Sequence, residues 1–594
     1  MLRLVFSCVD VGRYPLSESG NVNDLVIVGG GLAGMTAGVR ALELGLQAVV
    51  IEKGEGESYP CNSRQSGGIL HIGFLDPYRP PADLHAVIEQ RCSGEADQAL
   101  TTALAANGSQ FIDWLQDKGT RFVRFNELES YRWCMAPPRA LRAGLDWQGR
   151  GPDVLMRDLV KRFADLGGLF RSGTRAESLL MRAGVCCGVV VAKDGQSETI
   201  SASHVLIADG GFQANAELFK TYIGADFDRV FQRGARTGMG DGLSMAVAAG
   251  AALKGTDRFY GHVLCRDALH NDNVWPYPEI DAIATAGVVV NGAGQRLADE
   301  GLSGVYLTNM LAQAPADEPL FAIFDAAIWD KPGQSARIPA NPLLERAGGT
   351  VLQADTLVEL AALTGVEEAG LIATVQRYND ALSAGTLDQL AIPRSTQMQP
   401  WPIVEAPFMA IPVCPGITYT MGGIAIDEHA QVLTSAGEPI KGLFAAGAAT
   451  GGLEGGRQAG YIGGLIKAGV FGMIAAERVA ALSGTSTRTP LSNAPASVPA
   501  PAQSPSSRGA NSPARPARAP RLAKYPMLNG ILRFGTAAAI VFSLSAMALV
   551  LWMGWPSMGI VALPVAAMIG FAIAVVTLSC GELVRLITDM LLPE

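Results

Sequence analysis

The chain has 594 residues, 49% of them hydrophobic, and a formal net charge of −9 at pH 7. This length is enough for several domains with sizeable hydrophobic cores. The negative charge argues against nucleic acid as a partner, because phosphates would repel the chain. The nine cysteines include no C-x-x-C pair, so we expect no metal site of the zinc or iron–sulfur kind. Scattered thiols in an odd number are typical of a reducing, cytoplasmic setting.

The amino-terminal residues 1–21 contain an apolar stretch of only a few residues. A secretory signal has a longer apolar region, so the sequence predicts a loose tail here rather than an export signal.

The segment 24–53 carries the strongest motif of the chain. Two short apolar runs enclose a glycine cluster and a helical pattern. Gly29, Gly31 and Gly34 have the G-x-G-x-x-G spacing, in which the glycines allow a tight turn, backbone approach to a pyrophosphate and close helix–strand packing. The following helix would offer its N-terminus to the phosphates. Glu52, after the second run, stands where a carboxylate would bond a ribose hydroxyl.

Further glycine clusters follow strand-like runs near residues 204–212, 238–242 and 442–452. Strand–glycine–helix units at both ends of a chain indicate one nucleotide-binding domain that is interrupted by an insertion. We therefore predict an α/β fold with a Rossmann-like domain in two parts, 22–255 and 410–484. An α+β capping or substrate domain would occupy residues 256–409.

The order of several motifs resembles that of a known family. GGGLAG, NSRQSGG, IADGGF, TGMGDGLSMA, TYTMGGIAI and GLFAAGAATGG occur in this order between residues 22 and 482. Together they resemble the fumarate reductase/succinate dehydrogenase flavoproteins, a family of FAD-dependent oxidoreductases. VNGAGQRLADEG and ITYTMGG are most similar to the tricarballylate dehydrogenase branch, with steroid Δ1-dehydrogenases and urocanate reductases as more distant relatives.

The resemblance implies that FAD occupies the glycine cleft and that a capping domain covers its isoalloxazine ring. NSRQSGG lacks the histidine that attaches FAD covalently in the respiratory enzymes, so non-covalent FAD is expected. Carried over by motif, the expected FAD contacts are Gly29, Gly31, Gly34, Glu52, Ser63, Gly67, Gly68, Ala176, Ala208, Asp241 and Gly447.

Two positions depart from the family pattern. Ala448 replaces the acid that usually bonds the ribityl chain, which would cost roughly 1.5–3 kcal/mol unless Glu454 or a water substitutes. Gly304 stands where the fumarate reductases have a proton-shuttling arginine, four residues after the acid that corresponds to Glu300. Fumarate reduction by that shuttle is therefore not expected.

Desaturation moves a hydride to the flavin and a neighbouring proton to a protein base. The candidates are Tyr419 beside the Met-Gly-Gly turn, His262 in the predicted cap, Glu300 and Arg457. Arg457 would bind a substrate carboxylate with its forked guanidinium. A packed core tyrosine, a structural histidine, a surface arginine and a Glu300–Arg296 salt bridge are the competing interpretations.

These features predict an FAD-dependent enzyme that acts on a CH–CH bond of a small, carboxylated organic substrate. Two alternatives stay open. A ketosteroid-type ring desaturase would use Tyr260 and Tyr419 and need no carboxylate-binding arginine. An electron-transfer scaffold would have lost substrate chemistry, with Ala448 and Gly304 as marks of that loss. The sequence does not identify the substrate, the reaction direction, the electron partner, the acid/base or the oligomeric state.

The carboxyl-terminal part of the chain has a different composition. Residues 485–530 are rich in Pro, Ala, Ser and basic residues, which predicts a disordered linker. Within 531–594, residues 535–555 and 558–580 are two charge-free runs of membrane-spanning length. We predict a two-helix transmembrane hairpin whose basic flank keeps the catalytic domain in the cytoplasm, near a membrane electron carrier or redox partner.

Overall fold

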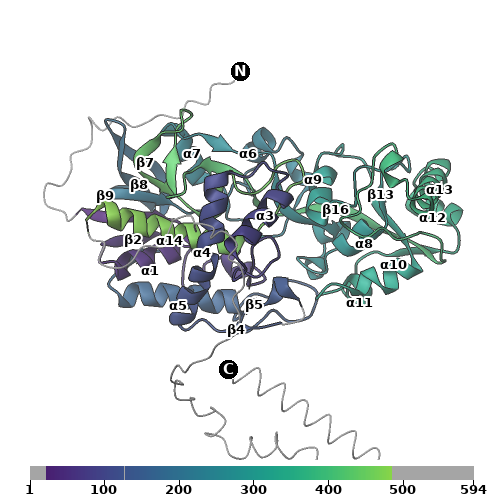
Figure 1. The fold of residues 1–594 in the computed structure, drawn as a ribbon, viewed down its shortest axis with the longest axis horizontal. Coiled ribbons are helices and arrows are strands. Elements are labelled where there is room, and N and C mark those ends of the chain that lie inside the picture. The colour runs from purple at the N-terminus through teal and green to yellow at the C-terminus, as the bar shows by residue number, and fades with distance from the viewer. Residues whose placement is uncertain (1–21, 126–127, 485–594) are drawn as a thin grey trace, which may run out of the picture. The chain divides into compact units, whose positions relative to one another are not determined.

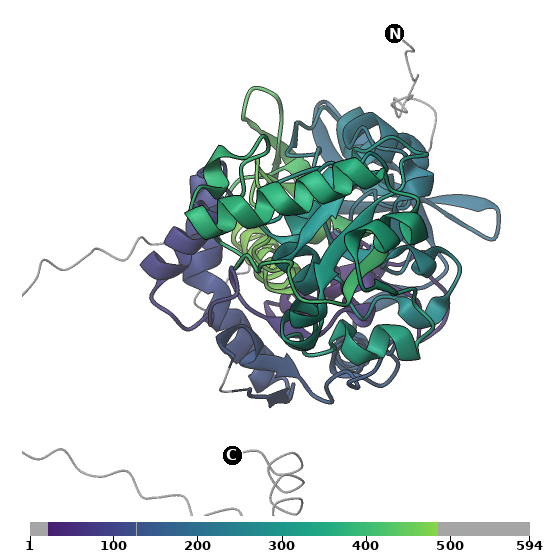
Figure 2. The same ribbon diagram turned by 90° about the vertical axis from the view of Figure 1, so that its right-hand side faces the viewer.

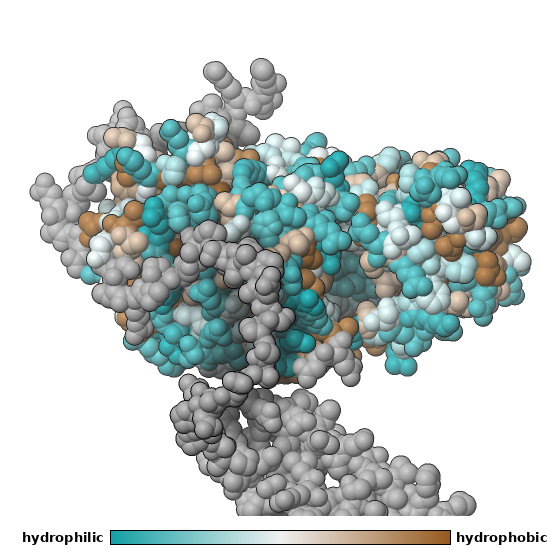
Figure 3. All heavy atoms as spheres, in the orientation of Figure 1, coloured by the Kyte–Doolittle hydropathy of each residue, from teal (hydrophilic) through white to brown (hydrophobic). Residues whose placement is uncertain are grey.

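Two β-sheets organise the part of the chain that the computed structural model describes, residues 22–125 and 128–484 (Figure 1). The predicted tail at 1–21, the linker at 485–530 and the hairpin at 531–594 lie outside the described residues. Within the described ranges, no helix combines the length and the apolar composition that crossing a membrane requires. Figure 3 shows polar and apolar side chains interspersed over the visible face of these residues.

The first sheet has eight strands and forms the nucleotide-binding core. Its main path runs β18-β19-β9-β1-β2-β6, and β7 and β8 extend it from β9. The pairs from β19 through β9, β1 and β2 to β6 are parallel. The strands are β1 (Asn23–Val28), β2 (Ala48–Ile51), β6 (Leu169–Arg171), β7 (Arg175–Arg182), β8 (Val185–Lys193), β9 (Gln196–Ile207), β18 (Gln431–Leu433) and β19 (Pro439–Ala445). The predicted α/β fold is confirmed.

Strands β1 and β2 are apolar runs without alternation because helices cover this sheet. All four residues of β2 are buried, as are the last four of β1. The covering helices are α1 (Leu32–Glu43), α5 (Gly151–Asp165) and α14 (Gly464–Leu482). α1 packs against both α5 and α14, so segments from the two ends of the domain meet, as the interrupted-domain prediction requires.

The turn between β1 and α1 depends on two glycines for different reasons. Gly29 has φ = +107°, a conformation that side-chain-bearing residues rarely adopt. Gly34 has an ordinary φ, but a Cβ there would lie 2.0 Å from the Gly29 carbonyl oxygen. The helix can therefore approach the strand only where it has no side chain.

The second sheet belongs to the cap. Its path is β10-β16-β14-β13, with β12 and β15 also paired to β16. The strands are β10 (Phe231–Gln232), β12 (Phe259–Cys265), β13 (Val288–Val290), β14 (Phe321–Asp325), β15 (Leu352–Ala354) and β16 (Phe408–Thr420). The long strand β16 runs through the predicted boundary at 409/410. The predicted domain boundaries stay a prediction, with this strand lying across the second of them.

Helices pack around the cap sheet, and Figure 2 shows the long helix α13 in front of it. These helices are α8 (Asp281–Ala286), α9 (Gly304–Ala312), α10 (Ala326–Asp330), α11 (Ala340–Arg346), α12 (Leu357–Thr364) and α13 (Glu368–Ala384). Local chemistry fixes the ends of α12 and α13. Thr356 and Glu359 form a capping box before α12, and Glu367 caps the first N–H groups of α13. Both helices end at a left-handed glycine.

The remaining strands are short, and the remaining helices include the long α4 (Gln98–Asp117), which packs against α14 and α3 (Pro81–Arg91). The strands are β3 (Ile69–Leu70), β4 (Phe122–Val123), β5 (Trp133–Met135), β11 (Leu253–Lys254), β17 (Gly423–Ala425) and β20 (Thr450–Gly451). The helices are α2 (Asn62–Gln65), α3 (Pro81–Arg91), α4 (Gln98–Asp117), α6 (Ala216–Tyr222) and α7 (Asp241–Ala248).

Replacing Gly34 by Ala should destabilise the fold itself. The new methyl group would meet the Gly29 carbonyl oxygen at 2.0 Å, and overpacking of this kind costs about 1–3 kcal/mol or more. Chemical denaturation of the cofactor-free protein measures the loss. Gly31→Ala is the matched control, since a Cβ at Gly31 has its nearest protein atom 3.5 Å away. Equal stability of the two variants would contradict this account of the turn.

Candidate active site

A cavity of about 860 Å³ lies where the carboxyl ends of β1, β2 and β9 meet residues of the cap. Ligands bind at this edge of open α/β sheets. Ten of the eleven predicted FAD contacts line the cavity: Gly29, Gly31, Glu52, Ser63, Gly67, Gly68, Ala176, Ala208, Asp241 and Gly447. Gly34 does not line it, because its role is the packing of α1 on β1.

Gly31 provides a test of whether a nucleotide fits this cavity. Its φ is −74°, and a Cβ would meet no protein atom closer than the Ser63 hydroxyl at 3.5 Å. The protein's own packing therefore does not require glycine here. The residue lines the cavity at the start of α1, where a pyrophosphate would approach the backbone. The Leu32 N–H of that first turn donates to Ser63 Oγ at 2.9 Å.

Glu52 is held at the cavity wall by backbone donors. Its two carboxylate oxygens accept from the N–H groups of Gly30, at 2.8 Å, and Gly54, at 2.7 Å. Burial raises the pKa of Glu52, and these two hydrogen bonds oppose the rise. Glu52 therefore also fixes the glycine turn, in addition to the ribose contact that the motif predicts.

Cations surround the next predicted contact, Asp241, at the start of α7. Its carboxylate oxygens pair with Lys53 Nζ at 3.0 Å and with Arg175 Nη2 at 2.6 Å. All three side chains line the cavity. At this end of the cavity, both cations thus share one acid.

The position of the missing acid, Ala448, lines the cavity beside Gly447. The Glu454 carboxylate is not free to take over the role of the missing acid, because both of its oxygens already have partners in the protein. Its oxygens accept from the Tyr419 hydroxyl at 3.0 and 3.1 Å and pair with Lys467 Nζ at 2.5 Å. Glu454 and Lys467 are 4% and 1% exposed, so this ion pair is a buried support behind Tyr419.

On the cap side, three side chains form a hydrogen-bonded line into the cavity. His262 Nδ1 lies 2.6 Å from Asp281 Oδ2, and His262 Nε2 lies 2.9 Å from the Tyr260 hydroxyl. Asp281 Oδ1 also accepts from the Val263 N–H, which fixes the carboxylate. An ionised Asp281 assigns the proton to Nδ1, so Nε2 accepts from Tyr260.

Glu279 joins this line from the side. Its Oε1 lies 3.4 Å from His262 Nε2. His262, Glu279 and Asp281 bring ligand atoms within 4.8 Å of one another and are the one such group among the described residues. Their hydrogen bonds to protein partners account for this closeness, so we assign no metal to it.

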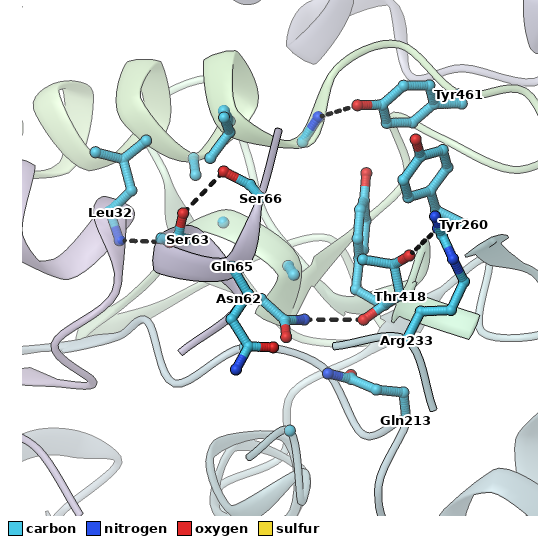
Figure 4. A pocket seen from close by; sticks show the side chains of 18 of the residues that line it. Leu32, Asn62, Ser63, Gln65, Ser66, Gln213, Arg233, Tyr260, Thr418 and Tyr461 are labelled. Carbon is cyan, nitrogen blue, oxygen red and sulfur yellow. Dashed lines mark hydrogen bonds between the residues drawn. The ribbon is translucent and has the colours of Figure 1, made fainter. Parts of the chain in front are cut away.

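Three tyrosines meet at the end of this line, and Figure 4 shows two of them, Tyr260 and Tyr461, facing each other. Tyr260 stacks on Tyr461 with ring centroids 3.9 Å apart, and Tyr419 lies 5.4 Å from Tyr260. Tyr260 and Tyr419 are directly opposite each other in the antiparallel β12–β16 pair. Burial holds the pKa of all three phenols above the usual value, so each is protonated at neutral pH.

Two of the predicted catalytic residues, Arg457 and Glu300, do not line the cavity. The Arg457 side chain is 81% exposed and pairs with Glu95 at 2.8 Å. Its neighbour Gln458 lines the cavity instead. Glu300 is fully buried, pairs with Arg296 at 2.5 Å and accepts from the Val289 N–H. These placements favour the competing interpretations, a surface arginine and a structural salt bridge.

Other residues of the site were not among the predicted ones. They are Tyr461, Glu279, Asp281, Arg139 and Arg233, all of which line the cavity. Tyr461 follows the predicted EGGRQAG segment by one residue and could have been included. No sequence motif pairs Asp281 with His262, because that contact depends on how α8 packs beside β12.

Comparison with known proteins agrees with this geometry. Residues 24–463 match the sequence profile of the family described as FAD binding domain. The chain is 31% identical over 396 residues to the NADH:acrylate oxidoreductase of Vibrio harveyi, which covers 64% of this chain but 36% of that protein. It is 27% identical over 488 residues to the fumarate reductase (cytochrome) of Shewanella frigidimarina, with 77% of each covered. The 3-oxosteroid 1-dehydrogenase of Mycobacterium tuberculosis is 25% identical over 587 residues, covering 78% of this chain and 99% of that protein.

Solved structures share the fold. An open flavocytochrome c3 fumarate reductase superposes with a TM-score of 0.57 at 24% identity, covering 78% of this chain and 79% of that one. The 3-ketosteroid Δ1-dehydrogenase from Sterolibacterium denitrificans gives a TM-score of 0.61 at 20% identity, covering 78% and 100%.

The chain belongs to the FAD binding domain family, among the fumarate reductase/succinate dehydrogenase flavoproteins. It is an FAD-dependent oxidoreductase of the class that acts on CH–CH groups, so the predicted family, cofactor and enzyme class are confirmed. The finer resemblance to tricarballylate dehydrogenases stays a prediction.

Gly31→Ala should lose FAD without losing the fold. The methyl group would enter the cavity beside the first turn of α1, where backbone must approach the pyrophosphate. We expect near-stoichiometric FAD in the wild type, released to the supernatant by acid precipitation, and a clear deficit in Gly31→Ala with unchanged circular dichroism. Flavin retained in the wild-type pellet would contradict non-covalent binding. Full FAD occupancy in Gly31→Ala would contradict this placement of the pyrophosphate.

Proposed function

We propose that this enzyme is a dehydrogenase or reductase of a CH–CH bond in a small, carboxylated organic substrate, with Tyr260 as its acid/base. The observation that carries the proposal is the line Asp281–His262–Tyr260, which ends in the FAD cavity. The names of the relatives support the substrate class, since acrylate and fumarate are small organic acids.

Bound FAD would supply the hydride acceptor or donor at its N5. The chain's own residues would handle the proton. For oxidation, His262 Nε2 takes the Tyr260 proton as the phenolate oxygen removes a proton from the substrate carbon. Asp281 holds the ring and stabilises the imidazolium, and Glu279 adds a second carboxylate at 3.4 Å. For reduction, the same atoms return the proton to carbon.

This relay solves a problem that burial creates. The raised pKa of Tyr260 makes the isolated phenol a poor base at neutral pH. When His262 takes the proton of Tyr260 during the reaction, no free phenolate has to form in advance. The positive charge appears instead on the histidine, where the neighbouring carboxylates neutralise it. The histidine's second nitrogen is therefore as important as the phenol itself.

Tyr419 is better suited to position the substrate. Its hydroxyl proton is held between the two oxygens of Glu454, which Lys467 in turn pairs with. The phenol oxygen can still accept a hydrogen bond from a ligand in the cavity. On this proposal Tyr419 orients the substrate and Tyr260 exchanges the proton.

A ring desaturase is the second candidate. Three clustered phenols suit the polarisation of a ring ketone. Relatives include the 3-oxosteroid 1-dehydrogenase and a 4-oxocyclohexanecarboxylate 2-dehydrogenase of Sinomonas cyclohexanicum, 24% identical over 538 residues. Anaerobic flavin spectroscopy with organic acids and with 3-ketosteroids separates the two candidates. If neither panel bleaches the oxidised flavin or reoxidises the reduced flavin, the electron-transfer scaffold is favoured.

Tyr260→Phe should lower kcat for turnover of any substrate by about 10²–10⁴-fold, the usual contribution of general acid–base catalysis. FAD content should not change, because the ring and its stacking on Tyr461 remain. Stopped-flow measurement of flavin reduction or reoxidation reports the step directly. His262→Gln should show a smaller loss, because water can replace part of the relay.

Tyr306→Phe is the matched control, since this half-buried tyrosine of α9 does not line the cavity. If Tyr260→Phe keeps wild-type kcat while Tyr419→Phe loses it, the assignment of the acid/base to Tyr260 fails.

The carboxyl-terminal membrane anchor remains a proposal from the sequence alone. The two charge-free runs within 531–594 and their basic flank support it. The full chain should stay with membranes after carbonate washing, whereas a chain ending at Gly484 should be released with its FAD. Release of the full chain by carbonate would contradict the anchor. Equal reduction or oxidation of membrane quinones by both forms would contradict its role in electron transfer.

A further inference from the structure

Two arginines beside the proton relay have unfilled hydrogen-bonding capacity. Arg139 and Arg233 both line the cavity and are 7% and 6% exposed. A guanidinium stays charged at every physiological pH and carries five donors. Burying it is costly unless those donors find partners.

The donors of both side chains can be counted. Arg139 Nη2 donates to the Gln65 carbonyl at 2.7 Å, whereas its Nε and Nη1 have no partner in the described structure. Arg233 donates from Nη1 to Thr418 Oγ1 at 2.9 Å, and from Nη2 both to the Pro276 carbonyl at 2.9 Å and to Glu279 at 3.0 Å. Its Nε also lacks a described partner. Three buried guanidinium nitrogens are therefore unsatisfied.

Both guanidinium groups lie near the aromatic ring of Tyr277. The guanidinium carbon of Arg139 is 5.0 Å from the ring centroid and that of Arg233 is 5.9 Å away. Glu279 pairs with Arg233, but within residues 22–125 and 128–484 no acid forms an ion pair with Arg139. The pair of arginines thus retains excess positive charge that a ligand could neutralise.

The arrangement also places this charge next to the chemistry. Figure 4 shows Arg233 rising between Thr418 and Tyr260. Glu279 connects Arg233, at 3.0 Å, with His262, at 3.4 Å. If these arginines hold a carboxylate of the substrate, the carbons next to that carboxylate would lie on the side of the cavity that carries the Tyr260 hydroxyl.

The other positions along the cavity are less suited to an anionic substrate. Lys53 and Arg175 are both paired with Asp241. Arg91 donates its Nε to the Gly73 carbonyl and lies over the Phe74 ring at 4.5 Å. The lining residues Gly304 and Gln458 carry no charge.

We infer that Arg139 and Arg233, both beside the ring of Tyr277, form the subsite that binds a carboxylate group of the substrate. The inference rests on the proposed function and specifies it. Planar carboxylates match the donor geometry of guanidinium groups. The subsite would select acids over their neutral amides, and it would orient the scissile C–H bond relative to Tyr260.

Titration of the oxidised holoenzyme tests the subsite through the flavin absorbance. Fumarate, acrylate and benzoate serve as acid probes, with fumaramide and benzamide as neutral counterparts. We expect at least one acid to perturb the flavin spectrum, and its amide to require at least tenfold higher concentration. Arg139→Gln and Arg233→Gln should each raise the acid's Kd at least tenfold. Arg139→Lys, which keeps the charge without the fork, should fall between.

Arg142→Gln is the matched control, because this arginine three residues further along is 65% exposed and does not line the cavity. It should leave acid binding unchanged. The inference is overturned if no acid binds, if acid and amide bind equally, or if both arginine variants bind acids as the wild type does. Loss of acid binding in Arg91→Gln alone would move the subsite to another wall and also overturn it. A fall in FAD content, with unchanged acid affinity in the remaining holoenzyme, would assign the arginines to the flavin instead.

Turnover separates this inference from the proposed function. If acids bind through Arg139 and Arg233 but the protein neither reduces nor oxidises any probe, the subsite is supported and the proposed function is contradicted. If an acid is turned over and both arginine variants keep the wild-type kcat/KM for it, the proposed function is supported and the subsite is contradicted.

Discussion

The antiparallel pairing of β12 with β16 is the constraint on which the reaction end of the cavity depends. Its register sets Tyr260 opposite Tyr419, and residues that face each other across an antiparallel pair project to the same side. One residue further along, Gly261 lies so close to β16 that a Cβ would be 1.8 Å from the Gly416 carbonyl oxygen. The close contact and the local irregularity after Tyr260 fix where the phenol ends. A slip of one residue would turn both tyrosines away from the cavity.

Charge is distributed differently at the two ends of the cavity. At the nucleotide end, Lys53 and Arg175 both pair with Asp241, and Glu52 accepts from backbone N–H groups. At the reaction end, carboxylates and cations form two separate supports. One runs from Asp281 through His262 to Tyr260, and the other from Lys467 through Glu454 to Tyr419. Buried charges of this kind are tolerated only when partnered. Arg139 and Arg233 combine unpartnered buried nitrogens with a position on the cavity wall, and substrate binding would explain this combination.

The departures from the family pattern have a common physical character. Ala448 and Gly304 line the cavity without charge, as does Gln458 beside the exposed Arg457. Positive charge is found at other positions, on the loop that contains Arg139 and on Arg233 beside β10. A fold of this kind supplies the cofactor site through its sheet edge, while the residues that meet the substrate come from loops and from the cap. Related proteins can thus keep the cofactor chemistry and alter which surface holds the substrate.

What the sequence by itself determined is local. The glycine spacing, the two apolar runs and Glu52 predict the β1–α1–β2 unit, since each depends on neighbours within about 30 residues. The order of motifs was specific enough to predict the family, the FAD and the interruption of the domain by a cap. His262 and Tyr419 were also found from their surroundings in the chain, and both line the cavity.

Only the tertiary structure decided which side chains act together. Arg457 lies one position from a lining residue, yet the direction of its side chain sends it to Glu95 at the surface. Glu300 is close in sequence to the lining Gly304 but is enclosed by its pair with Arg296. Tyr260 with Tyr419, and Arg139 with Arg233 around Tyr277, are contacts between residues far apart in the chain. Spacing along a sequence cannot encode such contacts, because strand register and the packing of the cap on the first sheet set them.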